Sequence, residues 1–198
     1  MERTGVVTFL GGPLTLVGPE IKAGDRAPDF TVLDNGLAPK SLKDFAGKTV
    51  VLSVTPSLDT PVCDAQLRRF NDTATKLADD VVVLNVSMDL PFANKRFCSV
   101  AGIEKAMTLS DHRDASFGSA YGVLVKELRL LARAIFVVGR DGVVKHAEIV
   151  PEMTHHPDYD KALAAAKETD ARTWNDGAAA TRRRGGPASR TCRCRPLR

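Results

Sequence analysis

The 198-residue sequence lacks the features that mark membrane proteins and small secreted domains. No uninterrupted apolar run approaches the roughly 18 residues of a membrane-spanning helix, and Gly11, Gly12 and Pro13 break the apolar N-terminal stretch. Its four cysteines are too few for the dense disulfide framework of a small secreted domain. We therefore expect neither membrane association nor a secretory signal, and a reducing cytoplasm as the location.

Positive charge is concentrated at the end of the chain. The formal net charge is +4, but residues 169–198 hold eight arginines, two aspartates and no lysine. This segment has almost no aliphatic residues to offset chain entropy. We expect a single domain over residues 1–168 and a disordered Arg-rich tail over residues 169–198. Weak polyanion binding by the tail is an alternative, but no specific nucleic-acid partner is expected.

Apolar periodicity predicts alternating strands and helices. Strands are expected over Val6–Leu10, Leu14–Val17, Thr49–Thr55, Val81–Val86, Ala132–Val138 and Val143–Ile149. Helices are expected over Val62–Ala78, around Asn94–Val100 and over Pro157–Lys167. This order predicts an α/β protein of thioredoxin-like fold, with a central mixed β-sheet flanked by helices and an N-terminal β-hairpin.

One loop carries the clearest chemical signal. It runs from Pro56 to Cys63 and joins a predicted buried strand to an amphipathic helix. The first turn of that helix offers Cys63 free amide groups and the positive end of the helix dipole, which favour a thiolate. The dipole contributes only about 0.3–1 kcal/mol, so the Thr60 hydroxyl and a nearby guanidinium are expected to add to it. Pro56 and Pro61 are expected to hold the loop backbone.

This loop resembles the peroxidatic motif of peroxiredoxins, specifically of their thiol peroxidase subfamily. The similarity covers residues 5–167 and includes Thr60-Pro-Val-Cys-Asp-Ala-Gln66, Arg68-Arg-Phe-Asn71, Asp89-Leu-Pro-Phe-Ala93, Arg96-Phe-Cys98, Leu109-Ser-Asp111, Ser116-Phe-Gly118, Ala120-Tyr-Gly122, Leu130-Leu-Ala-Arg-Ala134 and Pro157-Asp-Tyr159. The resemblance implies a peroxidase that reduces hydrogen peroxide or organic hydroperoxides. It further implies a homodimer, thioredoxin as the reductant, and no metal, haem or flavin cofactor.

The resemblance also implies roles for five residues. Cys63 matches the peroxidatic nucleophile, Thr60 and Pro56 its loop partners, Arg133 the arginine beside the thiolate, and Cys98 the resolving cysteine. Cys63 would become a sulfenic acid and condense with Cys98 of the same chain to a disulfide. Because a disulfide needs Cα atoms within about 7 Å, one helix end is expected to unfold during each turnover.

Simpler interpretations compete with these roles. Cys63 alone is compatible with a small buried hydrophobic residue, Cys98 with the buried face of a helix, and Thr60 with a helix N-cap. Arg133 would otherwise be expected to pair with a carboxylate. A thiol-disulfide oxidoreductase is disfavoured because the sequence has no Cys-x-x-Cys. A peroxide-responsive redox sensor or binding module stays an alternative function. No metal site is predicted, and the spacing of Cys192-Arg-Cys194 does not suit zinc.

Overall fold

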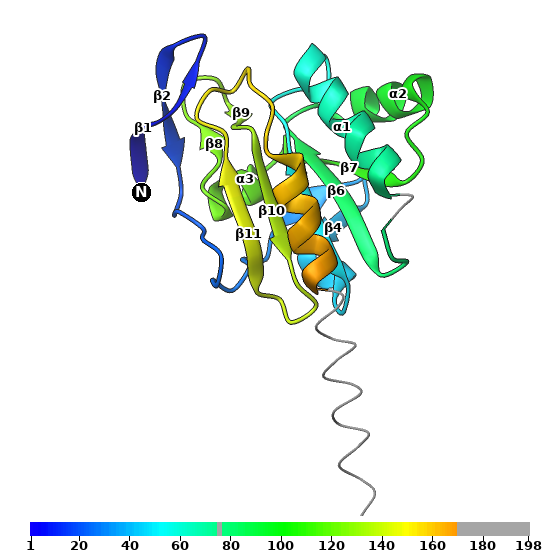
Figure 1. The fold of residues 1–198 in the computed structure, drawn as a ribbon. Helices are drawn as coiled ribbons and strands as arrows, with labels where there is room; N and C mark the ends of the chain where they lie inside the picture. The colour runs from blue at the N-terminus through cyan, green and yellow to red at the C-terminus, as the bar shows by residue number, and fades with distance from the viewer. Residues whose placement is uncertain (75–76, 170–198) are drawn as a thin grey trace, which may run out of the picture.

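The computed structural model describes residues 1–74 and 77–169, so the predicted tail lies outside the described residues except for Thr169. Figure 1 shows the arrangement of the elements. The strands are β1 (Glu2–Phe9), β2 (Gly12–Val17), β3 (Thr31–Leu33), β4 (Pro39–Ser41), β5 (Thr49–Val54), β6 (Val81–Ser87), β7 (Ala106–Ser110), β8 (Leu124–Val125), β9 (Leu130–Leu131), β10 (Ala134–Val138) and β11 (Val144–Ile149). The helices are η1 (Leu42–Phe45), α1 (Pro61–Ala74), α2 (Pro91–Ala101), α3 (Ser116–Ala120) and residues 159–169.

A seven-stranded mixed sheet in the order β11-β10-β5-β6-β7-β3-β4 forms the centre of the molecule. The strands β5, β6 and β7 are parallel, and β10 pairs antiparallel with β5. Every residue of β5 is buried, as its β-branched and apolar sequence predicts for a central strand. The predicted α/β fold with a central mixed sheet is confirmed.

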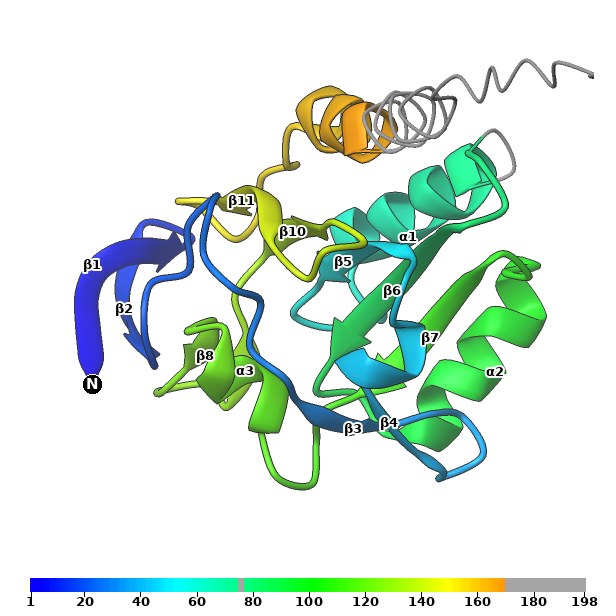
Figure 2. The same cartoon turned by 90° about the horizontal axis from the view of Figure 1, so that it is seen from below.

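Helices cover both faces of this sheet. α1 and the helical residues 159–169 lie side by side on one face, and α3 lies on the other (Figure 2). On the first face, the Phe70 and Tyr159 rings pack with their centroids 5.5 Å apart. On the second face, Phe117 packs against Phe30 and Tyr121. The helices α1 and α3 and the helical residues 159–169 therefore bury their apolar sides against the sheet.

The predicted N-terminal hairpin is confirmed as β1 and β2, which join β8 and β9 in a second sheet of four strands. The carboxylate of Glu152 fastens the hairpin turn to the domain. It accepts hydrogen bonds from the Thr8 hydroxyl (2.8 Å) and from the Leu10 and Gly11 amides (both 3.1 Å). The bonds from the Gly11 amide and the Thr8 hydroxyl lower the pKa of Glu152 to about 2, because they favour the ionised form.

Several predicted boundaries were wrong. The helix expected to reach Ala78 does not include residues 77 and 78, where the chain turns toward β6. The strand expected to begin at Ala132 begins at Ala134, because the Ala132 amide donates to the Val123 carbonyl (2.7 Å) instead of joining the ladder with β5. The helix expected to close at Lys167 extends over residues 159–169 in the described part of the chain.

α2 has clear signals at both ends. Pro91 occupies its first turn, where a missing amide costs nothing. Gly102 follows its last residue in the left-handed conformation (φ +67°) and donates its amide to the Cys98 carbonyl. Cys98 therefore lies in the last turn of α2. Within residues 1–74 and 77–169, no helix is long and apolar enough to cross a membrane.

Candidate active site

The candidate site lies where the parallel strands β5, β6 and β7 end. The loop after β5 leads into α1 with Cys63, and the loop after β6 leads into α2 with Cys98. The antiparallel register pairs Ala134 of β10 with Val54 of β5, which places Arg133 beside the loop that follows β5. Residues that are distant in sequence thus meet at one end of the sheet.

Cys63 and Arg133 are brought into direct contact in the interior. Cys63 is 0% exposed and Arg133 is 2% exposed. The Nη2 group of Arg133 donates to Cys63 Sγ at 3.3 Å. Cys63 occupies the first turn of α1, as predicted, because Pro61 begins the helix two residues before it. The Cys63 sulfur therefore lies beside a buried cation in the first turn of a helix.

The other Arg133 hydrogen bonds go to neutral acceptors. Nε donates to the Met153 carbonyl (2.9 Å) and Nη1 donates to Gln66 Oε1 (2.7 Å). In the described part of the chain, no carboxylate forms an ion pair with this guanidinium, so the acidic partner considered from sequence is not found. Burying a cation without an anion is costly, and a Cys63 thiolate would supply the compensating charge.

Gln66 was not identified as a site residue from sequence. It lies one turn after Cys63, so the two side chains share one face of α1. Its Nε2 donates to Ser53 Oγ (2.9 Å), and that hydroxyl donates to Asn85 Oδ1 (3.2 Å). The spacing of three residues from Cys63 could have indicated that the two side chains share a helix face. The hydrogen bonds that link Gln66 to the sheet could not be predicted in this way, because they depend on the pairing of β5 with β6.

Pro56 and Thr60 lie in the loop above Cys63. Pro56 is buried two residues after the end of β5, and Thr60 is exposed. The Thr60 carbonyl accepts the Asp64 amide (3.0 Å), which places Thr60 at the N-cap position of α1. Its hydroxyl donates to the Ser57 carbonyl at 2.9 Å, rather than to Cys63 as the sequence interpretation expected. The hydroxyl therefore stabilises the loop in this conformation.

Cys98 and Cys63 lie on neighbouring helices as free thiols. Arg68 of α1 connects the helices, because its Nη1 donates to the Ala101 carbonyl of α2 at 3.1 Å. Cys98 is partly buried, and its Sγ lies 3.3 Å from the hydroxyl of Thr108 on β7. A bond between the two sulfurs would replace the contacts of Cys63 with Arg133 and of Cys98 with Thr108.

Tyr159 borders the site from the start of the C-terminal helical segment. Its hydroxyl bonds to His156 Nδ1 (2.8 Å), and the Arg69 guanidinium lies 4.2 Å from its ring centroid. Burial raises the pKa of Tyr159, while the positive charges of Arg133 and Arg69 act in the opposite direction. Tyr159 and Arg69 also line a cleft of about 470 Å³ beside α1. Sequence reasoning did not single out Tyr159 as part of the site.

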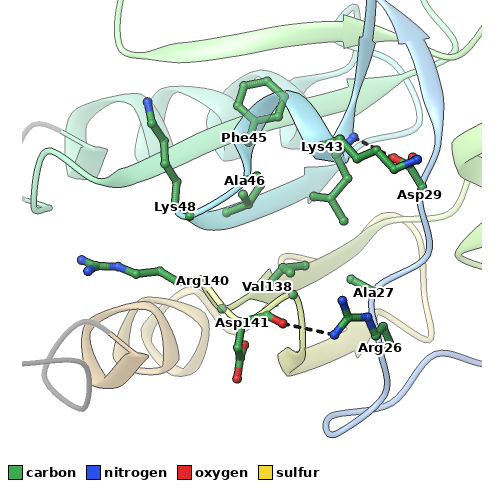
Figure 3. Close-up of a pocket in the computed structure, with 15 residues that line it drawn as sticks. Arg26, Ala27, Asp29, Lys43, Phe45, Ala46, Lys48, Val138, Arg140 and Asp141 are labelled. Carbon is green, nitrogen blue, oxygen red and sulfur yellow. Dashed lines mark hydrogen bonds and ion pairs between the residues drawn. The ribbon is translucent and has the colours of Figure 1, made fainter. Parts of the chain in front are cut away.

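A second cleft, of about 380 Å³, lies at the opposite end of the central sheet (Figure 3). Several of its charged side chains have partners within the cleft. Lys43 forms an ion pair with Asp29 (2.7 Å), and Arg26 donates to the Asp141 carbonyl (3.4 Å). This cleft adjoins the start of β5, whereas Cys63 follows its end, so the cleft is remote from the thiol. The described residues contain no cluster of ligands suited to a metal ion.

Comparison with known proteins places this site in a family. Residues 22–163 match the Redoxin family. The chain is 60% identical to a thiol peroxidase of Bacillus subtilis over 161 residues, which cover 81% of this chain and 96% of that protein. It is 56% identical to a thiol peroxidase of Staphylococcus aureus over 161 residues, covering 81% of this chain and 97% of the relative.

Solved structures support the same assignment. A peroxiredoxin-like protein from Aquifex aeolicus superposes with a TM-score of 0.78 at 41% identity, covering 84% of this chain and 97% of that one. A thiol peroxidase from Chromobacterium violaceum gives a TM-score of 0.74 at 20% identity over 84% of this chain and 97% of that one, which supports the fold alone. The chain belongs to the thiol peroxidase branch of the peroxiredoxins, within the Redoxin family, and is an enzyme that reduces peroxides with a thiol.

Proposed function

We propose that Cys63 is the peroxidatic nucleophile and that Cys98 of the same chain resolves its oxidised form. The contact that carries this proposal is the hydrogen bond from the buried Arg133 guanidinium to Cys63 Sγ. A buried cation with neutral acceptors on its other nitrogens stabilises an anionic sulfur. The thiolate is the form that attacks a peroxide.

In the first step, the Cys63 thiolate attacks one oxygen of the peroxide bond and becomes a sulfenic acid. The O–O bond breaks, and the second oxygen leaves with the electron pair and takes a proton, giving water or an alcohol. Arg133 stabilises the charge that develops on this leaving oxygen. Thr60 and Pro56 hold the loop that positions the peroxide, the first through its hydroxyl and the second through its fixed backbone.

In the second step, the Cys98 thiol attacks the Cys63 sulfenic acid, and a disulfide forms with release of water. Thioredoxin then transfers two electrons and two protons from its own dithiol, which restores both thiols and leaves thioredoxin oxidised. Sulfur carries all the redox changes in this cycle, so the proposal includes no metal, haem or flavin.

The proposal extends to assembly and location. Leu90 and Phe92 are large apolar side chains at the start of α2 and are 52% and 65% exposed. Burying them between two copies would remove apolar area from water beside the site, which supports a homodimer. A thioredoxin-dependent cycle operates in a reducing compartment, which favours the cytoplasm.

Peroxide turnover coupled to thioredoxin tests this proposal. Wild-type protein is compared with Cys63→Ser and Cys98→Ser, using hydrogen peroxide and cumene hydroperoxide as substrates. We expect no turnover with Cys63→Ser, and sulfenic acid without efficient recycling with Cys98→Ser. Equal activity of the three proteins would contradict the assigned roles. A single burst that thioredoxin cannot restart in wild type would favour the sensor function instead.

A further inference from the structure

Asp89 lies at the junction of the three loops that follow β5, β6 and β7. It belongs to the Asp89-Leu-Pro-Phe-Ala93 segment and lies two residues before α2. Its carboxylate accepts hydrogen bonds from the Ser57 hydroxyl (2.7 Å), the Leu58 amide (2.8 Å) and the Ser87 hydroxyl (2.9 Å). Its carbonyl accepts the Ser110 hydroxyl at 2.5 Å. One residue thus connects the loop before Cys63 to the ends of two neighbouring strands.

The contacts to Ser57 and Leu58 define the loop conformation. Leu58 is 3% exposed and packs in the same apolar cluster as Cys63. The Ser57 hydroxyl, which donates to Asp89, also accepts the Asp59 amide at 3.3 Å. The Ser57 carbonyl accepts both the amide (3.1 Å) and the hydroxyl (2.9 Å) of Thr60. Asp89 therefore holds Ser57, and Ser57 holds the residues that lead into the Cys63 turn.

The Asp89 carboxylate is half-buried and bonded to neutral donors. No cation among the described residues forms an ion pair with it. Its negative charge therefore strengthens the hydrogen bonds to the loop, since bonds to a charged acceptor are roughly twice as strong as neutral ones. The hydrogen bonds of the Asp89 carboxylate to Ser57 and Leu58 form a clamp on the loop. On its other side, Asp89 is fixed by the hydroxyls of the buried residues Ser87 and Ser110. The loop is consequently the part that leaves when the clamp opens.

We propose that Asp89 is a positioning residue that holds the Cys63 loop closed and thereby sets how fast oxidised Cys63 reaches Cys98. This inference rests on the proposed disulfide between Cys63 and Cys98. In the closed conformation, Cys63 contacts Arg133, which is the arrangement that peroxide attack uses. Disulfide formation requires the loop and the first turn of α1 to leave the closed conformation. The clamp therefore acts on the second step and leaves the first nearly unchanged.

The substitution Asp89→Asn tests this role with little change in shape. The amide keeps one acceptor oxygen but loses the charge, which weakens the bonds to the Ser57 hydroxyl and the Leu58 amide. The equilibrium for loop opening should rise by about tenfold. We expect disulfide formation to become about tenfold faster, and the rate constant of peroxide attack to change by less than threefold. Ser57→Ala removes one of the two loop bonds and should give about a threefold increase.

Rapid-quench alkylation followed by mass spectrometry measures both steps, because thiol, sulfenic acid and disulfide forms of the full chain differ in mass. At high peroxide, faster disulfide formation should lower the fraction of Cys63 that is oxidised to sulfinic acid. Hydrogen exchange of the reduced protein provides a readout that needs no catalysis. The Leu58 amide, which donates to Asp89, should exchange about tenfold faster in Asp89→Asn.

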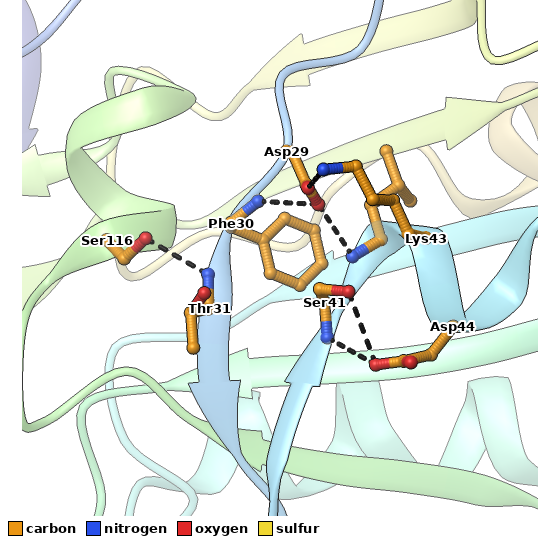
Figure 4. A network of polar contacts seen from close by, with 8 residues as sticks. Asp29, Phe30, Thr31, Ser41, Lys43, Asp44 and Ser116 are labelled. Atoms are coloured by element: carbon orange, nitrogen blue, oxygen red, sulfur yellow. Dashed lines mark hydrogen bonds and ion pairs between the residues drawn. The ribbon is translucent and has the colours of Figure 1, made fainter.

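Asp44 provides a matched control at a different edge of the sheet. Its carboxylate accepts the Ser41 amide (2.7 Å) and hydroxyl (3.3 Å), a similar pairing of aspartate and serine with no connection to Cys63 (Figure 4). Asp44→Asn should leave both rates unchanged. The same experiment on this variant measures how the loss of an aspartate–serine contact affects the two rates when that contact has no connection to Cys63.

The possible results separate the proposal from its premise. Faster disulfide formation with nearly unchanged peroxide attack supports the role of Asp89. An unchanged or slower disulfide step in both Asp89→Asn and Ser57→Ala, or an equal rise in both steps, overturns it. If Asp89→Asn does not fold, Ser57→Ala decides alone. A wild-type protein that forms no disulfide between Cys63 and Cys98 refutes the proposed function, while the exchange of the Leu58 amide still reports whether Asp89 holds the loop.

Discussion

Replacing Arg133 by methionine should reveal how much of the Cys63 reactivity depends on the buried guanidinium. The substitution keeps an unbranched side chain but removes the charge and three hydrogen bonds. Gln66 Oε1 and the Met153 carbonyl then lose a donor in the interior. Each unpaired buried acceptor costs about 1–3 kcal/mol of unfolding free energy. Far-ultraviolet circular dichroism and urea unfolding should therefore establish that the variant is folded under the conditions of the assay.

The effect on the sulfur follows from one contact. A hydrogen bond to a charged group contributes about 1.5–3 kcal/mol, so losing the bond from Nη2 removes up to that much stabilisation from a charged Cys63 sulfur. A less stabilised thiolate is a better nucleophile, with a Brønsted coefficient of about 0.4–0.5. Alkylation of Cys63 by iodoacetamide should then slow by about four- to twentyfold. Peroxide attack should slow further, because Arg133 also stabilises the leaving oxygen.

Both reactions are measured on Arg133→Met in a Cys98→Ser background, so that only Cys63 reacts among the two active-site thiols. Arg26→Met, at the opposite end of the central sheet, is the matched control and should change neither rate. Arg133→Lys retains the charge without the forked geometry and should be intermediate. A folded Arg133→Met variant whose Cys63 is alkylated at the wild-type rate would refute the claim that this contact stabilises the thiolate.

Three further predictions concern other polar groups. Burial raises the pKa of Asp111 from 3.8 to about 6, so its contribution to stability is fully present below pH 3.8 and is lost as the pH rises through 6. The loss should appear as a fall of about 3 kcal/mol in the unfolding free energy of wild type relative to Asp111→Asn, measured by urea unfolding from pH 4 to pH 7. A difference between the two proteins that does not change with pH would contradict this prediction. The pKa of Glu152 is lowered to about 2, so its contribution is present above pH 4.5 and is lost as the pH falls through 2. The protection of the Gly11 amide relative to its intrinsic exchange rate should fall over that interval in wild type, and Glu152→Gln should remove this fall. Thr108→Val removes the hydroxyl 3.3 Å from Cys98 Sγ and should speed alkylation of Cys98 a few-fold in a Cys63→Ser background; an unchanged rate would show that the contact does not restrain the sulfur.

The long elements of the fold were predictable because their patterns are local. The buried strand β5, the amphipathic helix α1 and the hairpin of β1 and β2 each carry a periodic or turn signal within one segment. β3 and β4, with three residues each, were missed, because a single register pair, Leu33 with Ser110, joins β3 to β7. Strands this short are defined by their neighbours in space, and one sequence does not show those neighbours.

The same limit applies to the site. Cys63 was identified from its own loop, since strand end, proline, threonine and helix start are consecutive in the chain. Its contact with Arg133 depends on the antiparallel register of β10 and β5, and the resemblance to peroxiredoxins, rather than local pattern, suggested it. Gln66 and Asp89 are ordinary polar residues in sequence, and their roles follow from hydrogen bonds across strand ends. The Arg-rich tail stays a prediction for residues 170–198, which lie outside the described part of the chain.

The glycine that terminates α2 has a consequence for the energy of disulfide formation. Because Gly102 stops the helix four residues after Cys98, unwinding from that end needs to release only the final turn before Cys98 gains freedom. Helix ends fray at low cost, so the portion that begins at Pro91 can stay docked on the sheet while the thiol swings out. Moving Cys98 one turn nearer the middle of the helix would require a longer segment to melt in every catalytic cycle.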